Sequence, residues 1–158
     1  MKFLFLCLIP FIVLFAKPNL ADKTQEEQVE DLVIKEKKWL TPTNSTCINK
    51  GGKIYEGICY AKWQDAKKIC SATAKRLPTF EELESAVTNC DGVIGEYNEN
   101  ENNNFYQKCY KNKGFNSSHY WSSTTNADDN NYAWIVSFFY GFSGSDPKRN
   151  YSYVRCVR

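Results

Sequence analysis

The sequence predicts a disulfide-stabilised α+β domain that works outside the cytoplasm. An apolar run at residues 3–16, FLFLCLIPFIVLFA, follows a short basic start, a pattern typical of a secretory signal peptide. Two amphipathic helical patterns then precede several extended runs, an order that favours an α+β arrangement. Six cysteines follow the apolar run, at Cys47, Cys59, Cys70, Cys90, Cys109 and Cys156. An even number of cysteines behind a signal peptide indicates three disulfides, although their spacing leaves the pairing open.

The N-terminal segment, residues 1–16, is interpreted as a signal peptide cut near Ala16 or as late as Ala21. Its apolar run is shorter than the roughly 20 residues that a membrane span needs. An uncleaved N-terminal anchor is the alternative. With the signal removed, we expect no stable membrane span and an extracytoplasmic location: the periplasm, the cell surface or the medium.

Composition narrows the function classes. The net charge is +2, from 20 basic and 18 acidic residues, which argues against a dedicated nucleic-acid binder. A single His and no Cys-x-x-Cys pair argue against a zinc site. Aromatic residues make up 15% of the chain, which suggests large flat side chains both in the core and on a contact surface.

Residues 17–46 are polar and predict a solvated helix or a tether, so that the domain itself is expected to span 47–158. At its start, Lys53 to Tyr60 has the pattern of two short extended runs around a Glu56-Gly57 turn. This predicts a hairpin, which a Cys47–Cys59 bridge would close.

Two helices are predicted next. Residues 62–75 carry apolar side chains at steps of three to four, at Trp63, Ala66, Ile69, Cys70 and Thr73. A second helix starts at Thr79, where Thr79 and Glu82 have the spacing of a capping box. Phe80, Leu83 and Val87 form its apolar stripe.

The second half is predicted to be loop and strand. Residues 91–118 are rich in Asn, Gly, Glu and Lys, which indicates a long irregular loop. Residues 120–124 and the nearly continuous apolar run 132–140 predict strands. Residues 141–150 have turn composition, and the alternating run 151–158 is expected to close a hairpin with 132–140.

Several strings together resemble a known bacterial family. They are Trp63-Gln64-Asp65-Ala66-Lys67-Lys68-Ile69-Cys70, Arg76-Leu77-Pro78-Thr79, Tyr120-Trp121-Ser122-Ser123-Thr124, Ala133-Trp134-Ile135-Val136 and Tyr153-Val154-Arg155-Cys156-Val157-Arg158. In this order they resemble the family named after the C-terminal domain of the Legionella collagen-like protein, over residues of about 60 to 158. One departure is Lys75, where the family usually has Trp.

The resemblance implies a C-type-lectin-like fold, with two helices packed on short antiparallel sheets, long loops and disulfide staples. It also implies ligand binding or adhesion outside the cytoplasm. By the same resemblance the first helix is bridged to the last strand, Cys70–Cys156, and the long loop is held by Cys90–Cys109. Cys47–Cys59 remains for the N-terminal hairpin.

The sequence offers little for a metal. Calcium-dependent lectins carry Glu-Pro-Asn or Gln-Pro-Asp in the long loop and Trp-Asn-Asp on a strand, and this chain contains none of these strings. The nearest oxygen-rich cluster includes Asp128, Asp129 and Asn131, but a solvated turn between strands is the favoured interpretation, since Asp and Asn are ordinary turn residues. We therefore expect no cofactor or metal; calcium would be the candidate if there were one.

Catalytic patterns are equally weak. His119 lies near Ser122 and Ser123, but the spacing implies no third group to orient a nucleophile. GFSGS, residues 141–145, departs from the Gly-x-Ser-x-Gly elbow at its last position. An oxidoreductase like the formylglycine-generating enzyme needs reactive thiols, and three disulfides would leave none. We expect no enzyme activity.

The aromatic residues suggest the ligand-binding surface. Eight of them gather near the C-terminus: Tyr132, Trp134, Phe138, Phe139, Tyr140, Phe142, Tyr151 and Tyr153. We expect about half to face outward and a glycan or protein ligand to bind in the loops 124–150. The candidate ligand-binding residues there are Asp128, Asp129, Asn131, Tyr140, Phe142, Lys148 and Arg149. A structural role in the cell envelope, without a small ligand, is the alternative.

Overall fold

The structure, a computed structural model, describes residues 39–158; the expected signal peptide and most of the expected tether lie outside the described residues. Residues 39–158 form five helices and eight strands. In chain order these are β1 (Trp39–Leu40), α2 (Asn44–Asn49), β2 (Lys53–Tyr55), β3 (Ile58–Lys62), α3 (Trp63–Ser71), α4 (Phe80–Thr88), α5 (Tyr97–Asn102), α6 (Asn104–Asn112), β4 (His119–Thr125), β5 (Tyr132–Ser137), β6 (Phe142–Pro147), β7 (Tyr151–Tyr153) and β8 (Cys156–Val157).

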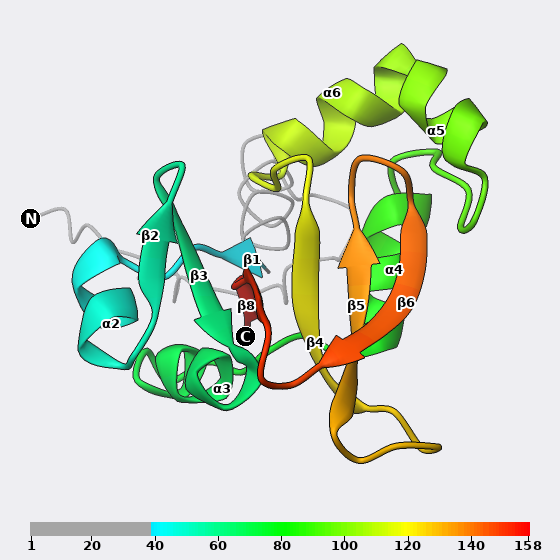
Figure 1. Ribbon diagram of the computed structural model, residues 1–158. Helices are drawn as coiled ribbons and strands as arrows, with labels where there is room; N and C mark the ends of the chain where they lie inside the picture. The colour runs from blue at the N-terminus through cyan, green and yellow to red at the C-terminus, as the bar shows by residue number, and fades with distance from the viewer. Residues whose placement is uncertain (1–38) are drawn as a thin grey trace, which may run out of the picture. The chain divides into compact units, whose positions relative to one another are not determined.

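Six strands form one mixed sheet in the order β2-β3-β7-β4-β5-β6, and β1 pairs with β8 in a second, two-stranded sheet (Figure 1). All neighbours are antiparallel except β4 and β7, which run parallel with Tyr120 opposite Tyr153. The α+β class is therefore confirmed. The expectations of only two helices and of purely antiparallel sheets are wrong.

The predicted hairpin between 132–140 and 151–158 is also wrong. The segment expected to be a turn contains β6, which pairs with β5 along its whole length, from Ser137 opposite Phe142 to Tyr132 opposite Pro147. Gly141 has a φ of 63°, which allows the tight reversal between the two strands. The next strand, β7, instead enters the sheet between β3 and β4.

The β2–β3 hairpin forms where it was predicted. Glu56 and Gly57 both have positive φ, at 50° and 77°, as a two-residue turn of the hairpin type requires. The buried side of this hairpin packs against α2 and α3. Helix α3 buries four of the five residues of its predicted stripe: Trp63, Ala66, Ile69 and Cys70. It ends at Ser71, a few residues before the predicted end.

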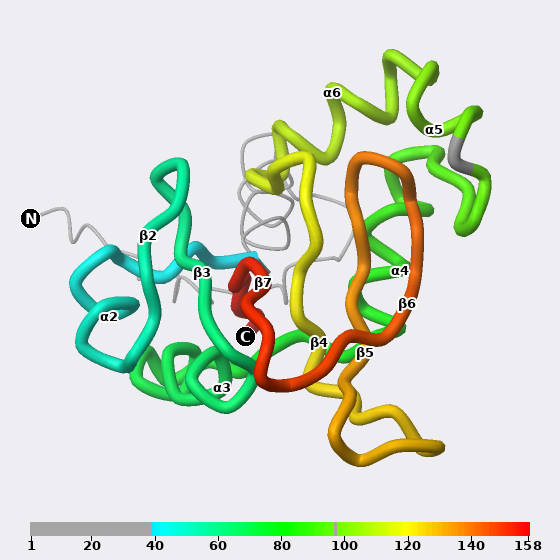
Figure 2. The backbone as a smooth tube through the Cα atoms, viewed as in Figure 1, coloured from blue at the N-terminus to red at the C-terminus, as the bar shows by residue number. Residues whose placement is uncertain are grey.

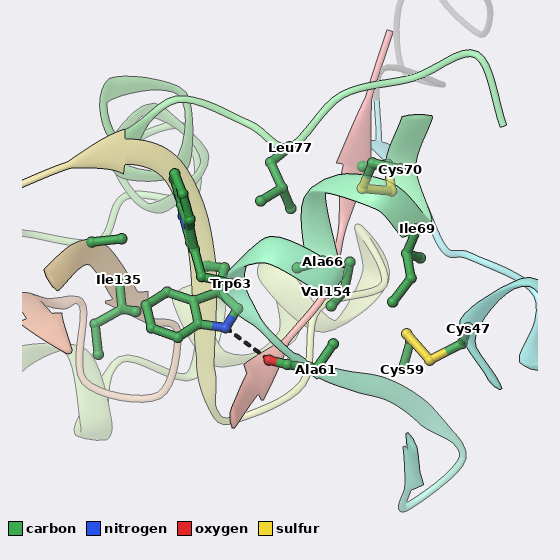
Figure 3. Packing of buried hydrophobic residues seen from close by; sticks show 13 residues of the cluster. Cys47, Cys59, Ala61, Trp63, Ala66, Ile69, Cys70, Leu77, Ile135 and Val154 are labelled. Carbon is green, nitrogen blue, oxygen red and sulfur yellow. Dashed lines mark hydrogen bonds between the residues drawn. A yellow bond between two sulfur atoms is a disulfide. The ribbon is translucent and has the colours of Figure 1, made fainter. Parts of the chain in front are cut away.

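The first core cluster lies between α3 and the sheet (Figure 3). It joins Trp63, Ala66 and Ile69 of α3 to residues of β3, β4, β5 and the C-terminal segment. The dashed line in Figure 3 marks the hydrogen bond that ends on the backbone oxygen of Ala61. This cluster fixes the position of β3 and, with it, the edge of the sheet.

The second helix begins as predicted. The Thr79 side chain accepts a hydrogen bond from the Glu82 amide, and the Glu82 carboxylate accepts one from the Thr79 amide. Helix α4 buries Leu83, Ala86 and Val87. Phe80 at its start packs on Trp134 of β5, with ring centroids 4.6 Å apart.

Residues 91–118 are not a long irregular loop, because they contain α5 and α6. Asn103 caps α6 by accepting a hydrogen bond from the Tyr106 amide, so an Asn that suggested a loop instead starts a helix. Tyr106 and Tyr110, one turn apart, are both buried in the second core cluster. Asn100 of α5 is 1% exposed and donates to the backbone oxygen of Tyr140.

The structure contains the three disulfides expected: Cys47–Cys59, Cys70–Cys156 and Cys90–Cys109. The folded domain, however, begins before Cys47. Strand β1 pairs with β8, which places Trp39 opposite Val157, and the trace in Figure 2 runs these two ends of the domain side by side.

Arg155 joins three parts of the chain near this N-terminal segment. Its guanidinium donates to the backbone oxygens of Lys113 and Gly114, both at 2.7 Å, and to the Thr41 hydroxyl. It also lies over the ring of Phe115. Burial lowers the pKa of Arg155 from its ordinary value. Residues before the boundary expected at 47 thus contact the rest of the fold, Trp39–Leu40 through β8 and Thr41 through Arg155.

Candidate functional site

The outer face of β2, β3 and β7 carries a concentration of tyrosines and lysines. Side chains alternate between the two faces of a sheet. Ile54, Cys59 and Ala61 point to the face that packs on α2 and α3. Their neighbours point to the opposite face. We call this set the tyrosine surface: Lys53, Tyr55, Tyr60, Lys62, Tyr151 and Tyr153.

The tyrosine rings of this surface contact one another around Tyr60. The Tyr60 and Tyr151 rings are stacked, with centroids 5.3 Å apart and an interplanar angle of 27°. Tyr153 and Tyr55 approach Tyr60 from other sides, with centroids at 5.3 Å and 6.1 Å. Tyr55 is 57% exposed, Tyr60 and Tyr151 are half-buried, and Tyr153 is buried where the surface meets the core.

Two lysines lie over the same ring. The Lys53 ammonium is 4.7 Å and the Lys62 ammonium 5.7 Å from the centroid of the Tyr151 ring. Both distances are within the range of cation–π attraction. The surface therefore combines flat apolar faces with two positive charges that point to solvent.

The rest of the same sheet face is covered. Tyr120 of β4 and Val136 of β5 lie on it and are fully buried in the second core cluster, together with Leu83 of α4 and Tyr106 of α6. The helices that pack against β2 and β3 lie on the opposite face. Among residues 39–158, the part of this sheet face that the helices leave uncovered is therefore the tyrosine surface.

The acidic residues predicted to bind ligand lie in the turn between β4 and β5. Asp128 and Asp129 are exposed, and the Asp129 carboxylate accepts hydrogen bonds from the amide and side chain of Asn131. The Asp128 amide donates to the Asn126 side chain. These are bonds of an ordinary turn. Within residues 39–158, no three His, Cys, Asp or Glu side chains gather in a metal-binding arrangement.

The Lys148 side chain is engaged in contacts within the protein. Its ammonium donates to the Thr125 hydroxyl at 3.0 Å and to the backbone oxygen of Asn130 at 2.7 Å, and it lies 4.2 Å from the centroid of the Trp63 ring. This side chain ties the β4–β5 turn to the β6–β7 connection. Arg149 beside it is exposed.

Tyr140 and Phe142 lie at the other end of the same hairpin. Strand β5 runs from the turn that holds Asp128 to the turn that holds Tyr140 (Figure 1). A six-residue strand spans about 17–20 Å. The seven predicted ligand-binding residues therefore divide into two groups at opposite ends of the sheet, and the fold does not bring them together into one site.

The catalytic pairs weighed from the sequence do not form among these residues. The Ser122 hydroxyl donates to the backbone oxygen of Trp134 at 2.8 Å, and the His119 side chain is exposed at the start of β4. All six cysteines of the described chain are in disulfides.

Sequence reasoning named Tyr151 and Tyr153 as surface candidates but missed Tyr55, Tyr60 and the two lysines. The sequence did contain a signal for these residues: Lys53 and Tyr55 are two residues apart, as are Tyr60 and Lys62, and residues two apart on a strand share a face. Only the pairing of β3 with β7 reveals that the two sets share one face.

These features define a disulfide-linked α+β domain with an open aromatic surface. Three disulfides are consistent with an extracellular location. No helix within residues 39–158 has the length and apolar character needed to cross a membrane. The chain belongs to the Lcl C-terminal domain family, whose model matches residues 26–158. A comparison with curated proteins finds no match.

Proposed function

We propose that the chain is an extracytoplasmic, non-catalytic binding module of C-type-lectin-like fold that attaches to a glycan or protein ligand through the tyrosine surface. The observation that carries the proposal is the open sheet face on which Tyr55, Tyr60 and Tyr151 are grouped with two lysines. The Cys70–Cys156 bridge between the first helix of the predicted pattern and the last strand supports the fold assignment.

Tyrosine suits such a surface for physical reasons. Its ring supplies a large contact area, its hydroxyl supplies a hydrogen bond, and only two side-chain torsions must be fixed on binding. Here the rings already hold one another in place, because Tyr60 is stacked on Tyr151 of the adjacent strand β7, and the hairpin that carries Tyr60 is held by the Cys47–Cys59 disulfide. Little conformational entropy remains to be lost, and this favours affinity.

The tyrosine surface supports binding better than the loops 124–150 do. Those loops divide between two ends of the β5–β6 hairpin, and Lys148 is already engaged with Thr125 and Asn130. A ligand would have to span the length of the strands to touch both groups. An adhesion role, as the family resemblance implies, needs only one contiguous surface.

The test is a glycan array together with a pull-down from envelope and host-cell extracts, using the disulfide-bonded protein. We expect Tyr151→Ala and Lys62→Ala each to weaken capture about tenfold, the effect of removing one good contact. Tyr140→Ala is the matched control, because Tyr140 is also an exposed tyrosine but lies in the β5–β6 turn. Full capture by Tyr151→Ala with loss in Tyr140→Ala would move the site back to the loops.

The pull-down and a thiol titration together separate the remaining alternatives. A stable envelope partner that co-purifies and is unaffected by either surface variant would favour a structural role. Two or more titratable thiols in the mature, folded protein would revive the oxidoreductase hypothesis, since such an enzyme needs free cysteines.

A further inference from the structure

A cleft of about 370 Å³ adjoins the tyrosine surface. It lies between the β2–β3 turn and the segment that leads from α6 to β4. Its size falls within the range of small-molecule sites, roughly 300–1,000 Å³. Its lining includes Tyr55, Glu56, Lys111, Asn116, Ser118 and Tyr153.

One wall of the cleft, residues 116–118, is held by its own backbone. The Asn116 amide donates to the Tyr120 hydroxyl at 2.7 Å, and the Ser118 amide donates to the Asn116 oxygen at 2.8 Å. The Ser118 oxygen in turn accepts from the Phe138 amide at 3.0 Å. The Ser117 hydroxyl pairs with the Tyr110 hydroxyl at 2.8 Å. Among the described residues, no hydrogen bond engages the Asn116 side-chain amide or the Ser118 hydroxyl.

The opposite wall presents Glu56 at an unfavourable backbone position. Glu56 has a φ of 50°, in the left-handed region that Asn and Gly adopt at lower free energy. A bulky acidic residue at this position is therefore not explained by the turn itself. Burial raises the pKa of Tyr153, and the negative charge of Glu56 adds to this rise.

The charges of the lining balance. Lys111 is the one basic residue of the lining, and Glu56 is the one acidic residue. Around them are neutral hydrogen-bonding groups and the exposed ring of Tyr55. A ligand with many hydroxyls and no net charge matches this set: a carboxylate accepts from hydroxyls, an amide both donates and accepts, and a ring packs against C–H groups.

We infer that this cleft binds the uncharged terminal sugar ring of a glycan, stacked on Tyr55 and held through its hydroxyls by Glu56 and Asn116. The inference rests on the proposed function and names its ligand class. The tyrosine surface then contacts the next part of the same ligand, because Tyr55 and Tyr153 belong to both.

The experiment uses the isotope-labelled mature protein and free neutral monosaccharides as probes: glucose, galactose, mannose and N-acetylglucosamine, with glucuronate as the charged comparison. We expect at least one neutral sugar to shift the amide resonances of residues 55–57 and 116–118, and glucuronate to bind more weakly. The inference is overturned if no neutral sugar shifts these resonances, or if glucuronate binds better than all of them.

Two variants separate binding from folding. Glu56→Asn relieves the backbone conformation, so the unfolding temperature should hold or rise while sugar affinity falls about tenfold or more. Asn116→Ala should weaken binding to a similar degree. Glu101→Gln, an exposed acid on α5, is the matched control and should change neither. Unchanged sugar affinity in Glu56→Asn would rule out the assigned role of its carboxylate.

Failure here is distinguishable from failure of the proposed function, because Tyr151 lies on the tyrosine surface but outside the cleft. If Tyr151→Ala no longer binds the extended ligand and no monosaccharide binds the protein, only the assignment of the cleft as a sugar site is refuted. If Asn116→Ala no longer binds the extended ligand but Tyr151→Ala still does, the tyrosine surface is refuted as the binding site and the cleft is supported.

Discussion

Trp63 and Trp121 each donate a hydrogen bond into the chain segment that carries the other. The Trp63 indole donates to the backbone oxygen of Ser122 at 2.8 Å, and the Trp121 indole donates to that of Ala61 at 2.9 Å. Strand β7 lies between β3 and β4 in the sheet, so this reciprocal pair links two strands that are not neighbours. It connects the hairpin that carries Tyr55 and Tyr60 to the centre of the sheet.

We expect Trp63→Phe and Trp121→Phe each to lower the free energy of unfolding by about 1–3 kcal/mol, through the lost hydrogen bond and the smaller ring. Because both bonds hold the same junction, the double variant should lose less than the sum, with a coupling of at least about 0.5 kcal/mol. Urea unfolding of the four proteins measures this. Strict additivity would mean that the two indoles act independently.

The Cys70–Cys156 disulfide should contribute more than Cys47–Cys59. Their sequence separations are 86 and 12 residues. In the chain-entropy model these loops correspond to about 4.6 and about 3 kcal/mol. Replacing each pair by Ala and comparing unfolding by denaturant tests the order, and mass spectrometry of a non-reduced digest checks the pairing. A Cys70–Cys90 peptide would refute the bridge assignment.

Thr79→Ala should cost about 1 kcal/mol, the usual effect of removing an N-cap side chain. Part of this loss of stability should act through Glu82, because its carboxylate accepts a hydrogen bond from the Thr79 amide. The same carboxylate also accepts two hydrogen bonds from the Arg76 guanidinium, at 2.7 Å and 3.0 Å. Thr88→Ala, at the other end of α4, is a suitable control. Thermal unfolding would contradict the prediction if the two variants were equally stable.

Alkaline pH should destabilise the fold through Tyr120. Burial raises the pKa of Tyr120 to about 12, against about 10 for an unperturbed tyrosine. The neutral form is the buried one, so its contribution is complete below about pH 10 and is lost as pH rises toward about 12, by roughly 2–3 kcal/mol. Denaturant unfolding across this range measures it. Tyr120→Phe should flatten the decline, although buried Tyr106, whose pKa burial also raises, leaves a residual slope.

Local patterns were predictable from the sequence. The α3 stripe, the Thr79–Glu82 capping box and the Glu56-Gly57 turn each depend on residues within a few positions of one another. The α5–α6 region was not predictable in the same way. Its Asn-rich composition indicates loop, and its helices depend on Asn103 as a cap and on a buried place for Tyr106 and Tyr110.

The candidate site was only partly visible in the sequence. Tyr151 and Tyr153 were among the eight aromatics of which about half were expected to face outward, yet we expected them beside β5, where β6 actually lies. The alternation of polar and apolar residues predicts which residues share one face of a strand, but it does not predict which strand pairs with it. The neighbour was β3, and that pairing places Tyr60 against Tyr151.

The sequence by itself determined the α+β class, the family and the short-range structure, because these depend on composition, motif order and contacts between near neighbours. Only the tertiary structure decided which strands pair, and therefore which side chains meet. The physical reason is burial, which depends on how the elements pack: Tyr120 and Val136 are covered by α4 and α6, whereas on the same face Tyr55 is exposed and Tyr60 is half-buried.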